Sequence, residues 1–150
     1  MLFTGSQFGK AEEAINFYTR VFDNSSADLV IHYPKEDNNA GKVMYSAFKL
    51  NQQDFIAMDG PGAHDYTFNE AVSFVVNCET QKEIDYYWNN LTKDGGQESM
   101  CGWLKDKFGV SWQIVPAIIG KLMSDPQKGQ RVMKEVLQMK KLDMEKLIEA

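Results

Sequence analysis

A weak internal repeat constrains the fold of this chain more than any other feature. Two segments, Lys10–Phe22 (KAEEAINFYTRVF) and Thr80–Leu91 (TQKEIDYYWNNL), carry apolar residues at the spacing of an amphipathic helix. They align with Ile15 over Ile84, Phe17 over Tyr86, Tyr18 over Tyr87, and Phe22 over Leu91. A repeat of this length indicates that one supersecondary unit occurs twice in the chain.

Strand-like segments flank both predicted helices. Those around the first are Leu2–Thr4 before it, and Ala27–Tyr33, Lys42–Leu50 and Asp54–Asp59 after it. Those around the second are Ala71–Asn77 before it, and Gln97–Lys105 and Val110–Val115 after it. The order is therefore β-α-β-β-β twice, although the second copy shows only two clear strands after its helix. We expect the joint between the copies at Asn69–Ala71.

A third segment follows the repeat. Asp125 and Pro126 predict the start of a helix, with the aspartate as N-cap and the proline in the first turn. The apolar stripe of that helix consists of Val132, Met133, Val136 and Leu137, and Asp143–Ile148 adds a further turn or two. We expect a first module over residues 1–68, a second over 69–116 and a C-terminal helical extension over 117–150, within a single structural domain. The apolar face of the extension packs either on its own sheet or on a partner subunit.

Composition excludes several classes of partner. The net charge of -5 and the dispersed basic residues argue against nucleic acid, which needs clustered Lys and Arg. The longest apolar run, Ile114–Ile119, contains Pro116 and is far shorter than the ~20 residues of a membrane helix, so we expect no membrane partner. The opening residues MLFTG read as a strand and not as a signal peptide. We therefore expect a cytoplasmic protein in which Cys78 and Cys101 are reduced.

Several stretches carry a family resemblance. They are FTG followed by KAEEAINFY, GKVMYSAFKL, FNEAVSFVVNCE, EIDYYW and CGWLKDKFGVSWQIVP. Together they resemble the PhnB-like group of the vicinal oxygen chelate superfamily, whose members are often labelled 3-demethylubiquinone-9 3-methyltransferase-like. The resemblance implies an α+β, glyoxalase/bleomycin resistance-like fold, in which two β-α-β-β-β modules form curved mixed sheets around a cleft. It also implies that a second chain often completes the cleft, and we expect a homodimer.

Metal-using relatives place His and Glu ligands on inward strand positions, where they leave room for the vicinal oxygens of a substrate. Carried over to this sequence, the histidine position of the second module falls near Ala71 or Ser73 and the closing glutamate position falls at Gln113. None of these residues is such a ligand. The two histidines, His32 and His64, lie on the second strand and in a loop. We therefore expect neither a metal nor another cofactor.

Five residues are candidates for ligand binding. Gln113 leads because it is polar within an apolar strand, although a buried amide bonded to backbone would look the same. Ser73 is expected opposite Gln113. Cys101 and Trp103 share one strand face and flank the cleft, unless they are a structural cysteine and a core tryptophan. Asp59 ends the fourth strand and also reads as a turn residue.

Two functions from different classes fit these residues. The first is metal-independent binding of an unknown small molecule in an aromatic and polar cleft. The alternative is a metal-assisted, glyoxalase-type lyase, isomerase or dioxygenase, in which His32 or His64 would converge with Asp59, and Gln113 is a further candidate for this set. The methyltransferase label of the family finds no support, because no glycine-rich turn of a doubly wound sheet is recognisable. Trp112 alternates away from Gln113 and is expected to pack under the C-terminal helices.

Overall fold

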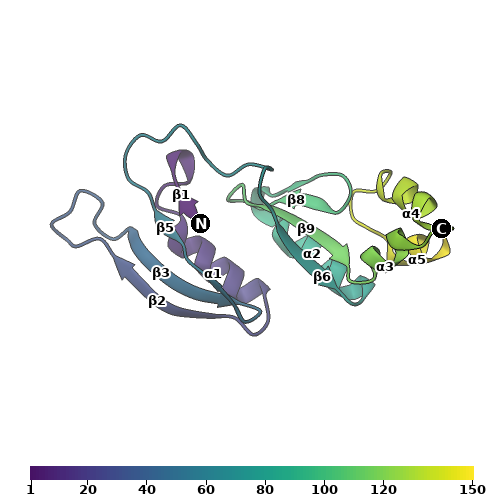
Figure 1. Cartoon of the computed structure of the whole chain (residues 1–150). Helices are drawn as coiled ribbons and strands as arrows, with labels where there is room; N and C mark the ends of the chain where they lie inside the picture. Colours follow the sequence, from purple (N-terminus) through teal and green to yellow (C-terminus); the bar gives the residue numbers. More distant parts are fainter. The chain divides into compact units, whose positions relative to one another are not determined.

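The computed structural model describes residues 1–150. The chain divides into two compact units, Met1–Thr67 and Phe68–Ala150, and both contain sheets with one amphipathic helix on one face (Figure 1). None of the helices has the length and apolar character that a membrane-spanning helix needs.

The first unit is a β-α-β-β-β arrangement whose last strand is interrupted. Its elements are β1 (Leu2–Phe3), a short 3-10 turn (Gly5–Gln7), α1 (Ala11–Val21), β2 (Ser26–His32), β3 (Val43–Leu50), β4 (Gln53–Phe55) and β5 (Met58–Asp59). Helix α1 lies where the apolar periodicity predicts it, and its stripe is buried at Ala11, Ala14, Ile15, Tyr18 and Val21. The apolar face of this helix therefore forms the core of the unit.

Strand β3 is central to the sheet of the first unit. It pairs antiparallel with β2 and with β4, while β1 pairs parallel with β5. The predicted strand Asp54–Asp59 is broken, because Ala57 bonds to a side chain and not to a neighbouring strand. The Ser46 hydroxyl donates to the Ala57 carbonyl (2.6 Å) and accepts from the Ala57 N–H (3.1 Å), both buried. These two bonds attach the break to β3.

The second unit repeats this order and adds helices. Its elements are β6 (Phe74–Cys78), α2 (Gln81–Leu91), a 3-10 turn (Lys93–Gly95), β7 (Gln97–Glu98), β8 (Trp103–Lys105), β9 (Ser111–Pro116), α3 (Ile119–Ser124), α4 (Gly129–Val136) and α5 (Met144–Glu149). The strand order is β6-β9-β8-β7, with only β6 and β9 parallel. The predicted strand Gln97–Lys105 is in fact two strands joined by a turn. The second unit therefore has three strands after its helix, which matches the first unit when β4 and β5 are counted as one interrupted strand.

Helix α2 covers one face of the second sheet. Its first turn is capped by Thr80, whose hydroxyl accepts from the Glu83 N–H at 3.2 Å. It buries Ile84, Trp88 and Leu91, and the sheet side chains buried in the same unit include Leu104, Trp112 and Ile114. These side chains form the core between α2 and the sheet. The other face of the sheet is open.

Trp112 lies in this layer, on the face opposite Gln113 as predicted. Its ring centroid is 5.3 Å from that of Phe74, and its indole N–H donates to the buried Asp106 carboxylate at 2.8 Å. The expectation that Trp112 packs under the C-terminal helices is wrong. Those helices pack against Cys101 and Val115, because the extension turns toward the far end of β9.

The C-terminal helices have their own small core. Its buried members are Val132, Val136, Leu142 and Leu147. The predicted helix start at Asp125 is three residues too early, because the Asp125 carboxylate caps a turn through the N–H groups of Gln127 (2.8 Å) and Lys128 (3.0 Å). Helix α4 begins after this turn. Met133 and Leu137 stay exposed, so the apolar stripe is narrower than predicted.

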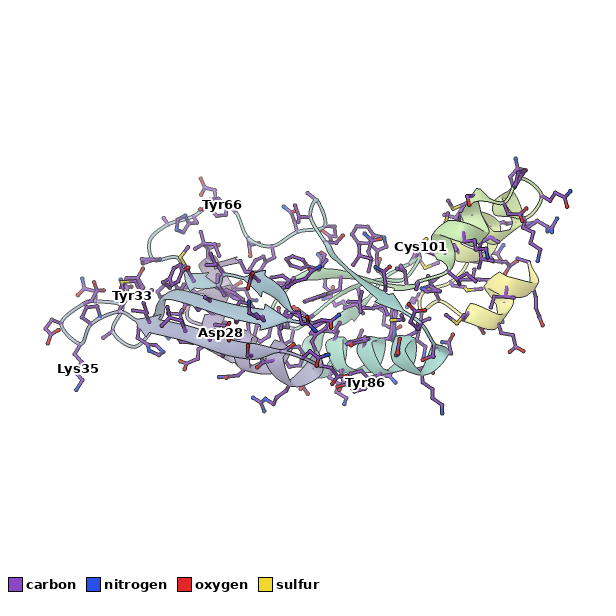
Figure 2. The ribbon with its side chains drawn as sticks, turned by 60° about the horizontal axis from the view of Figure 1, so that its bottom comes forward. Asp28, Tyr33, Lys35, Tyr66, Tyr86 and Cys101 are labelled. Carbon is purple, nitrogen blue, oxygen red and sulfur yellow. The ribbon has the colours of Figure 1, made fainter.

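The extension packs on the second unit of its own chain. Carbonyl groups of Met139 and Lys140 accept the N–H groups of Cys101 (2.7 Å) and Gly102 (2.8 Å). The extension is thus joined by backbone hydrogen bonds to the turn between β7 and β8. Figure 2 shows Cys101 beside the C-terminal helices.

Candidate functional site

The face of the second sheet opposite α2 is only partly covered. Trp103 and Gln113 are paired across β8 and β9, and so are Lys105 and Ser111. Directly paired residues project from the same face of a sheet, so these four side chains share the open face. An aromatic ring, an amide, an ammonium and a hydroxyl are thereby brought together on a sheet whose other face is a packed core.

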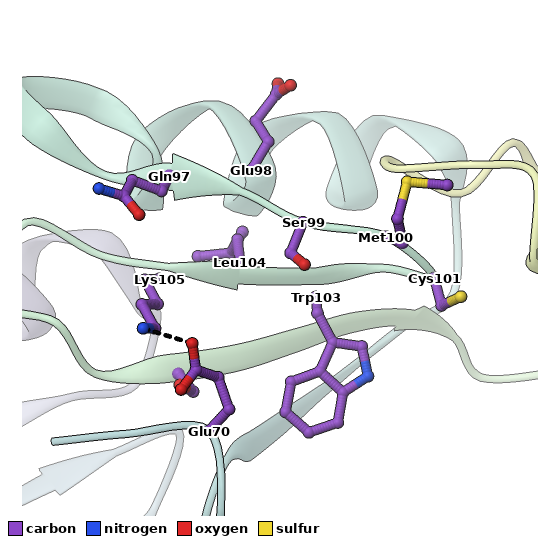
Figure 3. Close-up of a pocket in the computed structure, with 10 residues that line it drawn as sticks. Glu70, Gln97, Glu98, Ser99, Met100, Cys101, Trp103, Leu104 and Lys105 are labelled. Carbon is purple, nitrogen blue, oxygen red and sulfur yellow. Dashed lines mark ion pairs between the residues drawn. The ribbon is translucent and has the colours of Figure 1, made fainter.

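A pocket of about 450 Å³ lies at this face (Figure 3). The residues that line it are Glu70, Gln97, Glu98, Ser99, Met100, Cys101, Trp103, Leu104, Lys105 and Ser111. The Trp103 ring projects into it from β8, whereas the Glu98 side chain points to the other side of the sheet. The volume is within the range of ~300–1,000 Å³ that is typical of small-molecule sites.

One wall of the pocket is a tight turn. The Trp103 N–H donates to the Met100 carbonyl (3.1 Å), and Cys101 (φ 61°) and Gly102 (φ 81°) between them are both left-handed. This geometry is that of a type I′ hairpin turn. A Cβ on Gly102 would lie 2.7 Å from the Ile114 carbonyl oxygen, so only glycine fits there. Cys101 is therefore a turn residue, and the prediction that it shares a strand face with Trp103 is wrong, although both line the pocket.

The opposite wall is the irregular segment 68–73 that precedes β6. The Glu70 carboxylate pairs with the Lys105 ammonium, and the Ser111 hydroxyl donates to the Asn69 carbonyl at 3.3 Å. The Lys105 ammonium, which donates to Glu70, holds the pKa of that carboxyl below its ordinary value. Side chains on β8 and β9 therefore fix this segment along the pocket.

Gln113 and Ser73 lie together, as the sequence predicts. The Gln113 amide donates to the Ser73 hydroxyl at 2.9 Å, and both residues are half-buried. Neither lines the pocket itself, but Gln113 is the cross-strand partner of Trp103, which does. Their part in ligand binding stays a prediction.

Asp59 has a structural task in the first unit. It is 2% exposed, and its two carboxylate oxygens accept the N–H groups of Gly9 (2.7 Å), Ala11 (3.2 Å) and Val43 (2.8 Å). It therefore fixes the start of α1 and of β3, which is more than the turn role read from the sequence. It does not line the pocket of the second unit.

The two histidines are engaged separately. His32 lies 2.9 Å from the Glu12 carboxylate, and His64 lies 3.2 Å from the Pro61 carbonyl with its ring 5.0 Å from that of Tyr66. No group of three or more His, Cys, Asp or Glu side chains could hold a metal ion. Neither histidine lines the pocket.

Lys105 and Glu70 are among the pocket residues that the sequence did not single out as candidates for ligand binding. The run Lys105–Lys107 reads as a solvated hairpin, yet Asp106 within it is 2% exposed and accepts the N–H groups of Phe108 (2.9 Å) and Val110 (3.1 Å). The alternation of side chains along a strand could have identified Lys105, because it lies two residues after Trp103 and therefore on the same face. Nothing in the sequence indicates its pairing with Glu70.

The curved and unclosed sheets of the two units, together with the terminal helical part, are consistent with a glyoxalase-like fold, as in the PhnB-like structural neighbours. The chain belongs to the 3-demethylubiquinone-9 3-methyltransferase family, whose sequence model matches residues 1–115, and it is a PhnB-like member of that family. The C-terminal helices lie beyond the matched residues. No curated protein matches the sequence.

Solved structures agree with this assignment. A PhnB protein from Bacillus cereus, described as a 3-demethylubiquinone-9 3-methyltransferase, is 38% identical with a TM-score of 0.70, over 77% of this chain and 95% of its own. Protein PA1353 from Pseudomonas aeruginosa is 22% identical with a TM-score of 0.62, over 77% of this chain and 93% of its own. The second likeness shows the fold alone.

Proposed function

We propose that this protein binds a small molecule in the pocket on the open face of the second sheet, without a metal or other cofactor. The pocket itself carries the proposal. It combines the half-buried Trp103 ring with a few polar groups that could orient a ligand, which is the usual composition of such sites. Trp88 and Trp112, by contrast, are each 2% exposed and belong to the core.

The sheet topology favours binding over the chemistry of the family's name. A methyl donor such as S-adenosylmethionine is usually held at a glycine-rich turn of a doubly wound parallel sheet. Here only the pairs β1–β5 and β6–β9 are parallel, and the remaining strand pairs are antiparallel. We therefore do not extend methyl transfer to this chain.

The separate engagement of His32 and His64 supports the metal-independent form of the proposal over a metal-assisted lyase, isomerase or dioxygenase. A catalytic metal of that type needs several converging protein ligands. The ligand positions carried over from relatives fall near Ala71 or Ser73 and at Gln113, and the Gln113 amide donates to the Ser73 hydroxyl.

Ligand screening with chelator-treated protein tests this function. Small planar compounds are titrated while the indole N–H signals of the three tryptophans are followed by NMR. We expect a compound that saturates the Trp103 signal and leaves Trp88 and Trp112 unchanged, with the same affinity when zinc or manganese is added. Binding or turnover that appears only with added metal would favour the metal-assisted alternative.

We also propose that the protein is a cytoplasmic homodimer. Within the first unit, α1 covers one face of the sheet, and the side chains exposed on its strands include Leu29, Ile31 and Tyr45. Apolar side chains in such a group are typical of interfaces. Light scattering at micromolar concentration should give the mass of two chains, and the mass of one chain would contradict the dimer.

The state of the cysteines supports the cytoplasmic part of this proposal. Both cysteines are free, which suits a reducing compartment.

A further inference from the structure

We infer that the pocket takes ligands in which a planar apolar body carries an anionic group, with the body against Trp103 and the anion on Lys105. This inference rests on the proposed binding function and names the chemical class of its ligand.

The anionic half follows from Lys105. It carries the only positive charge among the side chains that line the pocket. It stands on β8, which is paired on both sides, so the base of the side chain is held by the sheet. The side chain is 32% exposed, so an ammonium donor is available at the pocket.

Glu70 shows which chemistry Lys105 accepts. The Glu70 carboxylate, on the irregular segment before β6, forms an ion pair with the Lys105 ammonium. The Glu70 side chain is 61% exposed. Exposed ion pairs of this kind are weak, because water screens both charges. A ligand anion can therefore replace the Glu70 carboxylate on Lys105 while Glu70 turns into solvent.

The other carboxylate near the pocket does not compete. Glu98 accepts the Trp88 indole N–H at 2.9 Å, and its side chain lies on the α2 side of the sheet (Figure 3). Lys105 therefore meets one protein carboxylate, and that carboxylate comes from a segment without regular structure.

The planar half follows from Trp103. Its ring projects into the pocket from β8, and stacking on an aromatic face favours flat apolar groups. Because Trp103 and Lys105 are two residues apart on one strand, they project from the same face and can contact two ends of one molecule. A cavity of about 450 Å³ suits a body of one or two rings.

A cationic ligand held by Glu70 and the Trp103 ring is the competing possibility. It would have to displace Lys105, whose strand keeps the ammonium near the pocket. Two positive charges would then lie close together in it. The arrangement therefore favours the anion.

Three probes with one ring system and different charges test the inference: 2-naphthoate, 2-naphthamide and 2-naphthylmethylammonium. Each is titrated at neutral pH into the full chain by calorimetry, and the Trp103 indole signal reports the site. We expect 2-naphthoate to bind about tenfold more tightly than the amide, because it gains a charge-assisted hydrogen bond. Lys105→Met should abolish this preference and leave the affinity for the amide unchanged.

Two further variants complete the design. Glu70→Gln should tighten 2-naphthoate binding and not amide binding, because the competing carboxylate is gone. Lys107→Met is the matched control: Lys107 lies over the Phe108 ring at 5.0 Å, does not line the pocket and carries the same charge. This variant should keep the preference for 2-naphthoate.

The outcomes separate this inference from the proposed function. Equal binding of naphthoate and amide at Trp103, unaffected by Lys105→Met, overturns the anionic class and leaves small-molecule binding intact. Tightest binding of the ammonium probe also overturns it. If none of the probes moves the Trp103 signal at millimolar concentration, the pocket is wrongly assigned and both proposals fail.

Discussion

The side-chain amide of Gln113 donates a 2.9 Å hydrogen bond to the hydroxyl of Ser73. Ser73 comes directly before β6, and Gln113 is paired with Val75 in the parallel ladder between β6 and β9. The bond therefore fixes the end of the segment that carries Glu70. Gln113 is also the cross-strand partner of Trp103 on β8.

A double-mutant cycle on Gln113→Ala and Ser73→Ala should show coupling between the two side chains. We expect a coupling of about 0.5–1.5 kcal/mol in the free energy of unfolding, as for a neutral hydrogen bond. Urea denaturation of the wild type, both single variants and the double variant measures it. Additive effects of the two substitutions would show that the bond contributes nothing to stability.

Asp59→Ala should destabilise the first unit strongly. The substitution leaves three backbone N–H groups without their carboxylate acceptor, two of them in buried hydrogen bonds, so we expect a loss of about 2–4 kcal/mol. Asp54→Ala is the control, because Asp54 is exposed and pairs only with Lys49 on the surface; it should cost less than about 1 kcal/mol. Thermal denaturation compares the two variants. Equal losses would contradict the structural role of Asp59.

The sequence predicted the helices of the repeat more accurately than the turns. Apolar spacing is a local signal, and it located α1 and α2 to within one residue at each end. The turn at Cys101 escaped prediction because cysteine is not a residue that favours a left-handed conformation. That conformation is held by hydrogen bonds that the turn donates to the carbonyl groups of Met139 and Lys140, which are distant in the sequence.

The pocket was only partly predictable for the same reason. Alternation along β9 correctly separated Gln113 from Trp112. The groups that bond to Asp59 and Lys105 come from segments far away along the chain, and only tertiary packing brings them together. Sequence reasoning could identify the strands of the site but not its ion pair.

The two cysteines should differ in reactivity. Cys78 is fully buried, and burial raises the pKa of its thiol to about 12, so almost no nucleophilic thiolate forms near neutral pH. Cys101 is partly exposed at the pocket. Iodoacetamide at mildly alkaline pH should therefore modify Cys101 in the native protein and Cys78 only after unfolding, as mass spectrometry of the peptides would show. A native Cys101→Ser variant should take up no label, and rapid labelling of Cys78 would contradict its burial.

Gln81→Ala should loosen the C-terminal extension without changing the oligomeric state. The Gln81 side chain accepts the Met144 N–H (2.8 Å) and donates to the Leu142 carbonyl (3.2 Å), so it joins α2 to the segment that leads into α5. We expect a loss of about 1–3 kcal/mol and faster hydrogen exchange in α5. Gln138→Ala, at an exposed side chain for which no hydrogen bond is found, is the control. Dissociation into monomers would instead indicate that the extension forms a subunit interface.

Glu98→Gln should destabilise the protein at neutral pH, and the difference should shrink in acid. The Trp88 indole N–H donates to this carboxylate at 2.9 Å, and Lys140 lies 3.6 Å away. The Trp88 bond first, and then the Lys140 charge, lower the pKa of Glu98 below its ordinary value of 4.5. A carboxyl whose pKa is lower in the folded state adds stability above its unfolded pKa, and that stability is lost as the pH falls through the folded pKa.

The size of this effect is limited by solvent. The Glu98 side chain is 48% exposed, so we expect a difference below about 1 kcal/mol at neutral pH. Urea denaturation of the wild type and Glu98→Gln, at neutral pH and at several values below 4.5, measures the difference in the free energy of unfolding. Glu145→Gln, at an exposed carboxyl of α5 that forms no ion pair, controls for the change in net charge. A difference that stays constant or grows in acid would show that the ionised carboxylate is not what stabilises the contact with Trp88.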